Sequence, residues 1–167
     1  MIAEIMGFSI RNLPAFLFVL AFVGALLNRH DRPAAERLLS WVLLLPIGGA
    51  SLWAGIFHVF FPATAAAYIG WQASPFQFEV GMADLAIGVT ACIAFWRDLG
   101  FQAAVVTTAS IFLLGDAIGH VRQMIVAGNF APGNAGVPFY LDVACPLLAI
   151  ALLLCAGRGR QRIHARF

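Results

Sequence analysis

The sequence predicts an all-α fold, an integral membrane bundle of five transmembrane helices that forms one domain over residues 1–167. Of the 167 residues, 62% are hydrophobic and only 11% are charged, whereas about a quarter of the residues of a soluble domain are charged. The mean hydropathy is +0.89. Five apolar runs reach or approach the ~20 residues that a bilayer-spanning helix needs. They cover about residues 8–27, 38–61, 75–96, 101–126 and 138–156.

Local signals mark where three of these helices should begin. Residues 74–77 read Ser-Pro-Phe-Gln, which is a capping box with proline at the first helical position. Asp31 followed by Pro33 favours a similar start for the second helix, and Pro138 should open the fifth. Each signal predicts a helix start within a few residues.

Residues inside the second and fifth runs predict how those helices bend and pack. Pro46 interrupts the second run and Pro146 the fifth, so both helices should kink. Ser51 and Gly55 have the four-residue spacing of small side chains that lets membrane helices approach closely.

The distribution of arginine predicts the orientation, because cationic side chains favour the cytoplasmic side. All ten cationic residues are arginines, and only Arg11 and Arg122 belong to the other side. The eight that share one side are Arg29, Arg32, Arg37, Arg97, Arg158, Arg160, Arg162 and Arg166. We therefore expect a multi-pass protein of a bacterial inner membrane, with the N-terminus outside and the C-terminus in the cytoplasm. The outer segments 62–74 and 127–137 carry no charge, and the first is a candidate for a short interfacial helix.

Composition also excludes several classes of protein. The net charge of +2 is small and gives no reason to expect a nucleic-acid partner. The three cysteines lie in apolar runs without a CxxC motif, which argues against a disulfide framework or a thiolate zinc site. No Ser-His-Asp order, phosphate loop or dinucleotide fingerprint is present. The lipid bilayer is the expected partner, and a homo-oligomer or a larger membrane complex stays open.

Six titratable side chains lie within the apolar runs, on four of the five predicted helices. They are His58, Glu79, Asp84, Asp116, His120 and Asp142. A charge at mid-bilayer costs roughly 2.5–3.5 kcal/mol on insertion scales, so such residues are functional candidates. With a rise of about 1.5 Å per residue, all six fall in the outward-facing half, with Asp84 and Asp116 deepest. This shared depth predicts one outward-facing polar pocket.

Four of the six form the predicted site for a metal or a proton relay: His58, Asp84, Asp116 and His120. Asp116 and His120 share a helix face at i,i+4, so they could chelate one ion or pass a proton, or simply hydrogen-bond to each other. Asp84 lies too deep to be explained by a helix start, and Gly81 and Gly88 would bring a neighbouring helix close to it. His58 could be a ligand, a proton carrier or a satisfied polar group.

Three further residues are predicted to support the site without forming it. Glu79 and Asp142 lie near helix starts, where the helix dipole favours a carboxylate. Arg122 could be a counter-ion for either carboxylate, or its side chain could extend to the interface.

The residue types leave the chemistry of the pocket open. A divalent metal, zinc or iron, is one prediction, and proton relay is the other. A haem between the two histidines would leave the carboxylates unexplained. One alternative function is a membrane enzyme acting on lipid or quinone, with Trp71, Phe76 and Phe78 at a lipid-facing entrance or simply in an aromatic belt. The other is a non-catalytic accessory subunit of a larger complex, so the sequence does not decide whether the chain is an enzyme.

Four short strings support a family resemblance. They are Gly-Ile-Phe-His ending at His58, Ser-Pro-Phe-Gln-Phe-Glu-Val-Gly over 74–81, Gly-Asp-Ala-Ile-Gly-His over 115–120 and Ala-Pro-Gly-Asn-Ala-Gly over 131–136. The chain resembles an uncharacterised family of small bacterial polytopic membrane proteins over about residues 45–155. It is also similar to DoxX-like membrane proteins in size and hydropathy. Neither resemblance implies a catalytic residue.

Overall fold

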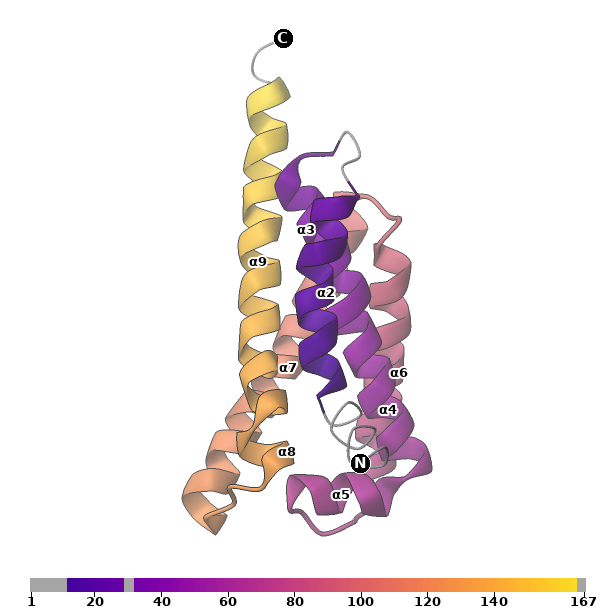
Figure 1. Cartoon of the computed structure of the whole chain (residues 1–167), viewed down its shortest axis with the longest axis vertical. Coiled ribbons are helices and arrows are strands. Elements are labelled where there is room, and N and C mark those ends of the chain that lie inside the picture. The colour runs from indigo at the N-terminus through magenta and orange to yellow at the C-terminus, as the bar shows by residue number, and fades with distance from the viewer. Residues whose placement is uncertain (1–11, 29–31, 165–167) are drawn as a thin grey trace.

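The computed structural model describes residues 12–28 and 32–164, and within them every regular element is a helix (Figure 1). The long helices run along one axis, and the short α5 and α8 lie together at one end. The elements are α2 (Leu13–Leu27), α3 (Ala34–Val42), the π-helical η1 (Leu43–Gly49), α4 (Ala50–Phe60), α5 (Pro62–Ile69), α6 (Phe76–Ala94), α7 (Leu99–Ala127), α8 (Pro132–Ala135) and α9 (Val137–His164).

Four helical segments among the described residues are long and apolar enough to cross a membrane. They are Ala34–Phe60, which joins α3, η1 and α4, then Phe76–Ala94, Leu99–Ala127 and Pro132–Gly159. The first predicted span corresponds to α2, which is apolar but has only 15 residues. Its predicted start at residue 8 lies outside the described residues. The chain is therefore a membrane-embedded helical protein, and the count of five spans is not confirmed.

The predicted capping box at the start of α6 is wrong. The helix begins at Phe76 with Pro75 at the N-cap, and no side chain caps it. The Gln77 side chain instead bonds to His58 on the neighbouring helix α4, so a tertiary contact replaces the expected local one. Asp31 lies outside the described residues, and α9 begins at Val137, one residue before Pro138.

The two internal prolines behave differently. Pro46 lies inside the π-helical η1, where the widened turn accommodates a residue without an N–H group. Pro146 lies inside α9, which continues through it to His164 without interruption. The predicted interruption is therefore seen only at Pro46.

Small residues allow α4 and α6 to approach closely, as the sequence predicts. A methyl group added at Gly88 would lie 2.8 Å from the backbone nitrogen of Leu52, and one at Gly55 would lie 2.8 Å from the backbone oxygen of Gly81. Only glycine permits this contact between the two backbones. The pair forms one side of the bundle, next to a buried cluster that includes Leu39, Leu43, Ile47 and Val106.

The two ends of the bundle differ in charge. Arg32 and Arg97 line a small cavity at the end where the C-terminal part of α9 also lies (Figure 1). We call this the arginine end. The opposite end carries α5 and α8 and is called the cavity end. The predicted short helix within 62–74 is confirmed as α5, while the membrane orientation is not confirmed, and Arg11, Arg29 and Arg166 lie outside the described residues.

Candidate functional site

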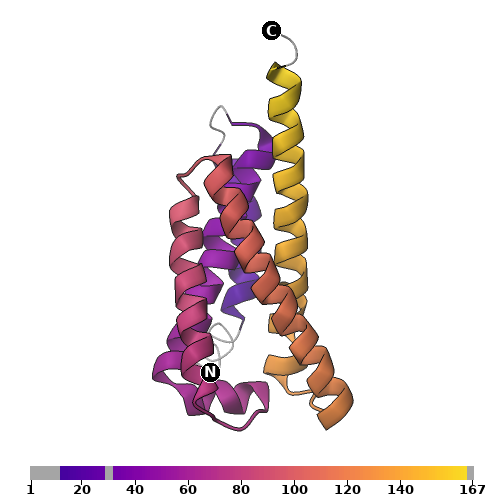
Figure 2. The ribbon, with the colours of Figure 1, turned by 180° about the vertical axis from the view of Figure 1, so that it is seen from behind.

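The cavity that gives the cavity end its name has a volume of about 320 Å³ and lies among α4, α5, α6, α7 and α9. Figure 2 shows the reason for the space: α7 starts beside α6 and diverges from it toward this end, where it meets α9. All four predicted site residues line the cavity, and Asp142 joins them. The titratable side chains in its wall are His58, Asp84, Asp116, His120, Asp142, Tyr68 and Cys145. Aromatic and aliphatic side chains form most of the remaining wall.

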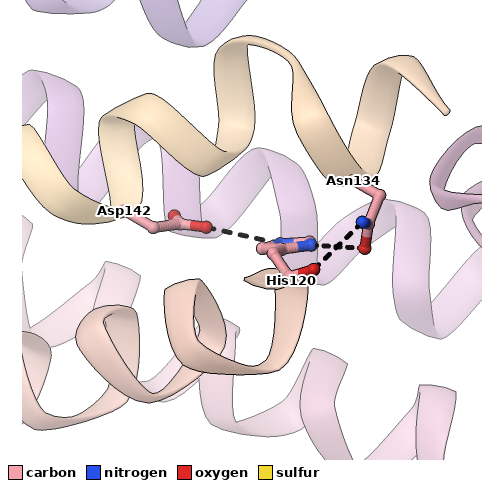
Figure 3. A network of polar contacts seen from close by, with 3 residues as sticks. All are labelled: His120, Asn134 and Asp142. Atoms are coloured by element: carbon pink, nitrogen blue, oxygen red, sulfur yellow. Dashed lines mark hydrogen bonds and ion pairs between the residues drawn. The ribbon is translucent and has the colours of Figure 1, made fainter. Parts of the chain in front are cut away.

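His120 makes polar contacts through both of its ring nitrogens (Figure 3). Its Nδ1 lies 2.8 Å from Oδ1 of Asn134 on α8, and its Nε2 lies 3.5 Å from Oδ2 of Asp142 on α9. His120 is only 8% exposed and Asn134 is fully buried. The predicted partner Asp116, one turn away on α7, makes no hydrogen bond or ion pair with His120 in the described part of the chain, so the intrahelical pair does not form.

The contacts of Asn134 decide which nitrogen of the His120 ring carries a proton. The Asn134 amide nitrogen donates to the backbone oxygens of Asn129, at 2.9 Å, and His120, at 3.2 Å. Its Oδ1 therefore faces His120 and can only accept, so Nδ1 of the ring donates. The second nitrogen, Nε2, faces Asp142. One proton between Nε2 and the carboxylate is favourable on either atom, as an ion pair or as a neutral imidazole and acid.

Asp84 and Asp116 lie in the same wall without comparable partners. Asp84 is 6% exposed, and no hydrogen bond or ion pair of Asp84 or Asp116 occurs among the described residues. Asp84, Asp116 and Asp142 all line this one cavity. A carboxylate removed from water is costly unless it holds a proton or pairs with a cation. This part of the cavity therefore has a capacity for positive charge that the described side chains do not fill.

His58 is held from the other side of the cavity. Its Nδ1 pairs with Oε1 of Gln77, so Gln77 fixes the ring on α4 from the start of α6. Gln77 is itself buried, at 6% exposure. Sequence reasoning used Gln77 only as a capping residue and missed this role. A glutamine among apolar residues in the first turn of a membrane helix was the available signal.

Two of the predicted supporting residues lie elsewhere. Glu79 and Arg122 are both exposed, and neither lines the cavity. Within the described residues no ion pair joins Arg122 to Glu79 or Asp142. Of the three predicted supporting residues, only Asp142 lies in the cavity wall.

The segments α5 and α8 hold the outer end of the site together. The Asn129 side chain donates to the backbone oxygens of Ile69, at 2.9 Å, and Gly70, at 3.3 Å. Gly133 lies close to Tyr68, because a methyl group added at Gly133 would be 2.7 Å from the backbone oxygen of Tyr68. These contacts place Asn134 against His120. The sequence analysis quoted the string over 131–136 that contains Asn134 but assigned it no role.

The geometry gives the metal prediction no support. Within the described residues, no group of three His, Cys, Asp or Glu side chains could hold one metal ion. Zinc or iron bound by His58, Asp84, Asp116 and His120 together therefore stays a prediction, as does a haem between the two histidines.

Comparison with known proteins gives one match. A family of unknown function, DUF6790, matches residues 11–162, a longer stretch than the quoted strings cover. No curated protein and no solved structure matches the chain.

Proposed function

Because the chain belongs to DUF6790, a family of unknown function, we propose a function from its own cavity: it binds and relays protons between the outer face of the membrane and Asp84. The path runs through the His120–Asp142 pair and Asp116 to Asp84, with His58 on the facing wall. Asp142, which the sequence predicted as a supporting residue, is a relaying residue in this proposal, and Glu79 and Arg122 take no part.

The observation that carries this proposal is the position of His120 between Asn134 and Asp142. Asn134 fixes the proton on Nδ1 and leaves Nε2 to exchange a proton with the carboxyl group 3.5 Å away. An imidazole oriented by a second group in this way is a usual arrangement for proton transfer. Asp116 lies one helical turn from His120 and lines the same cavity, which provides the next proton-binding group inward.

We propose the orientation predicted from arginine for this function. The arginine end, with Arg32, Arg97 and Arg158, would face the cytoplasm of a bacterial inner membrane. The cavity would then open toward the outer face. The uncharged α5 and α8 support this, because they present no side-chain charge to the interface. We also propose that α2 completes a fifth span together with the residues that precede it.

The test measures proton uptake by the protein in lipid vesicles, with a pH-sensitive dye in the weakly buffered external solution. A step in external pH should produce rapid proton uptake by wild-type protein and little by Asp142→Asn. Asp98→Asn is the matched control, because Asp98 is an exposed carboxylate outside the cavity and the substitution changes the charge equally. Equal uptake by Asp142→Asn and Asp98→Asn would refute the relay.

A second candidate function has one observation in its favour. The cavity wall is mainly apolar and contains Trp53, Phe57 and Trp71, which suits an enzyme that acts on a lipid or quinone. Mass spectrometry of molecules that remain bound after gentle purification tests it. A stoichiometric quinone or lipid that is lost in His120→Ala would favour the enzyme.

Two further measurements on the same preparation test the other predictions. Sizing would show an oligomer or a larger complex, and metal analysis of wild type, Asp116→Ala and His120→Ala tests whether zinc or iron is bound.

A further inference from the structure

Building on the proposed relay, we propose that the cavity binds a hydrophobic organic cation. Its positive charge would lie against Asp84 and Asp116, and its apolar part would pack on Trp53, Phe57 and Trp71. The inference names a ligand class for the same cavity, so it rests on the proposed function, although its test is separate.

The balance of charge in the cavity wall is the first argument. Three aspartates line the cavity. No arginine among the described residues does so, and the chain contains no lysine. Both histidines are already engaged, His58 with Gln77 and His120 with Asn134 and Asp142. The protein therefore supplies acidic groups in excess of cationic ones.

The second argument is the state of Asp84. Asp84 is only 6% exposed, yet it lines the cavity and has no hydrogen-bond partner among the described residues. A buried carboxyl group without partners is expected to cost free energy unless something else occupies the site. A proton satisfies this need in the relay, and a cation of a ligand would satisfy it equally.

The aromatic wall selects an organic cation over a metal ion. The rings of Trp53 and Phe57 contact each other at a tilt of 56°, with centroids 4.5 Å apart, and both residues line the cavity. Tryptophan faces attract alkylated ammonium groups, most strongly where water is excluded. A metal ion would need several close ligands at one point, which the described residues do not provide. The volume of about 320 Å³ lies at the lower end of the range of about 300–1,000 Å³ for small-molecule sites.

The probe is benzyltrimethylammonium, with neopentylbenzene as its uncharged isostere. Calorimetric titration into the purified full chain in detergent should give saturable binding of the cation and none of the isostere. Asp84→Asn should weaken binding about a hundredfold, which corresponds to removal of one buried charge partner. Asp98→Asn, the matched control, should leave affinity unchanged, and Asp84→Glu, which keeps the charge, should restore most of it.

Several outcomes would overturn the inference. They are equal heats for the cation and the isostere, equal affinity of wild type and Asp84→Asn, or equal weakening by Asp98→Asn. Asp84→Glu is the control for a folding defect. Recovered binding in this variant shows that the position tolerates substitution, and a failure to recover counts against the contact between Asp84 and the cation. Proton exchange is measured on the same preparations. A wild type that exchanges protons through Asp142 but binds no cation leaves the relay standing, and the reverse result refutes the relay alone.

Discussion

The buried polar groups at the two ends of the bundle are treated differently. At the arginine end, Gln102 donates from Nε2 to Ser40 Oγ and to the backbone oxygen of Ala94, each at 3.0 Å. Ser40 in turn donates to the backbone oxygen of Glu36 at 3.1 Å. These groups join α3, α6 and α7 in one hydrogen-bonded cluster, which fixes the helices next to the apolar core.

At the cavity end, the network around His120 is similarly complete, but Asp84 and Asp116 face a cavity without partners in the described chain. The fully buried side-chain atoms that lack a partner among the described residues are Arg37 Nε and Ser110 Oγ, and neither residue lines the cavity. The comparison teaches that the arginine end uses polar side chains for structure, while the cavity end keeps some of them available. Substitutions at four positions test this difference between the two ends.

The largest effect is expected at Asn134. Asn134→Ala leaves His120 Nδ1 and two backbone oxygens without their partner, so the free energy of unfolding should fall by about 3 kcal/mol. Proton exchange should fall too, because the ring loses its fixed orientation. Denaturant titration in detergent and the vesicle assay measure the two. Loss of stability with unchanged proton exchange would separate Asn134 from the relay.

Gln102→Leu should destabilise the protein by about 1–2 kcal/mol, since Ser40 Oγ and the Ala94 oxygen lose a buried donor. Proton exchange should not change, because Gln102 lies at the arginine end. The control is Gln72→Leu, which changes an exposed glutamine and should alter stability by less than about 0.5 kcal/mol. Reduced proton exchange in Gln102→Leu would contradict the separation of the two ends.

Asp84→Asn should have the opposite pattern, with proton exchange lost and stability within about 0.5 kcal/mol of wild type or higher. The reason is that Asp84 has no hydrogen-bond partner to lose in the described chain, while the amide carries no charge to bury. Denaturant titration measures the stability of this variant, and the vesicle assay measures its proton exchange. A loss of more than about 1 kcal/mol would mean that Asp84 is a structural residue.

The smallest effect is expected at Asp98, outside the spans. The backbone N–H of Phe101 donates to Asp98 at 3.0 Å and caps α7, which holds the pKa of this carboxyl group below its usual value of 3.8. A lowered pKa stabilises the folded state above pH 3.8, and this stabilisation disappears as the pH falls through the folded value. Asp98→Asn caps the helix at every pH, so its stability should change less with acid. Identical acid profiles would exclude the contribution of this cap.

The sequence was sufficient to predict what depends on composition and helical period. Apolar runs located the long helices, and depth along them brought His58, Asp84, Asp116 and His120 to one cavity. It was insufficient for choices between partners on different helices. Gln77 was expected to cap its own helix, and a hydrogen bond between His120 and Asp116 was one of the alternatives left open. In the structure, each finds a partner on a neighbouring element, because tertiary packing decides among local alternatives that are nearly equal.

Buried Glu36 is a second case. It lies near the start of α3, at the arginine end, and we expected every intramembrane carboxylate in the outward-facing half. Glu36 precedes the predicted second span, which starts at about residue 38, and so was not among the six candidates. In the structure α3 packs against α9, and Glu36 lines the small cavity with Trp96 and Leu99, contacts that no local pattern reports.

The π-helical segment Leu43–Gly49 has a mechanical consequence. It joins α3, which is anchored in the apolar core, to α4, which carries His58 and the aromatic side of the cavity. Wider π turns and a proline leave this segment with fewer regular backbone hydrogen bonds than the helices on either side. Leu43 and Ile47 of this segment belong to the same buried cluster as Leu39, so side-chain packing supports a turn that its own backbone holds less regularly. The wall that carries His58 is therefore positioned by packing of this segment as much as by its backbone.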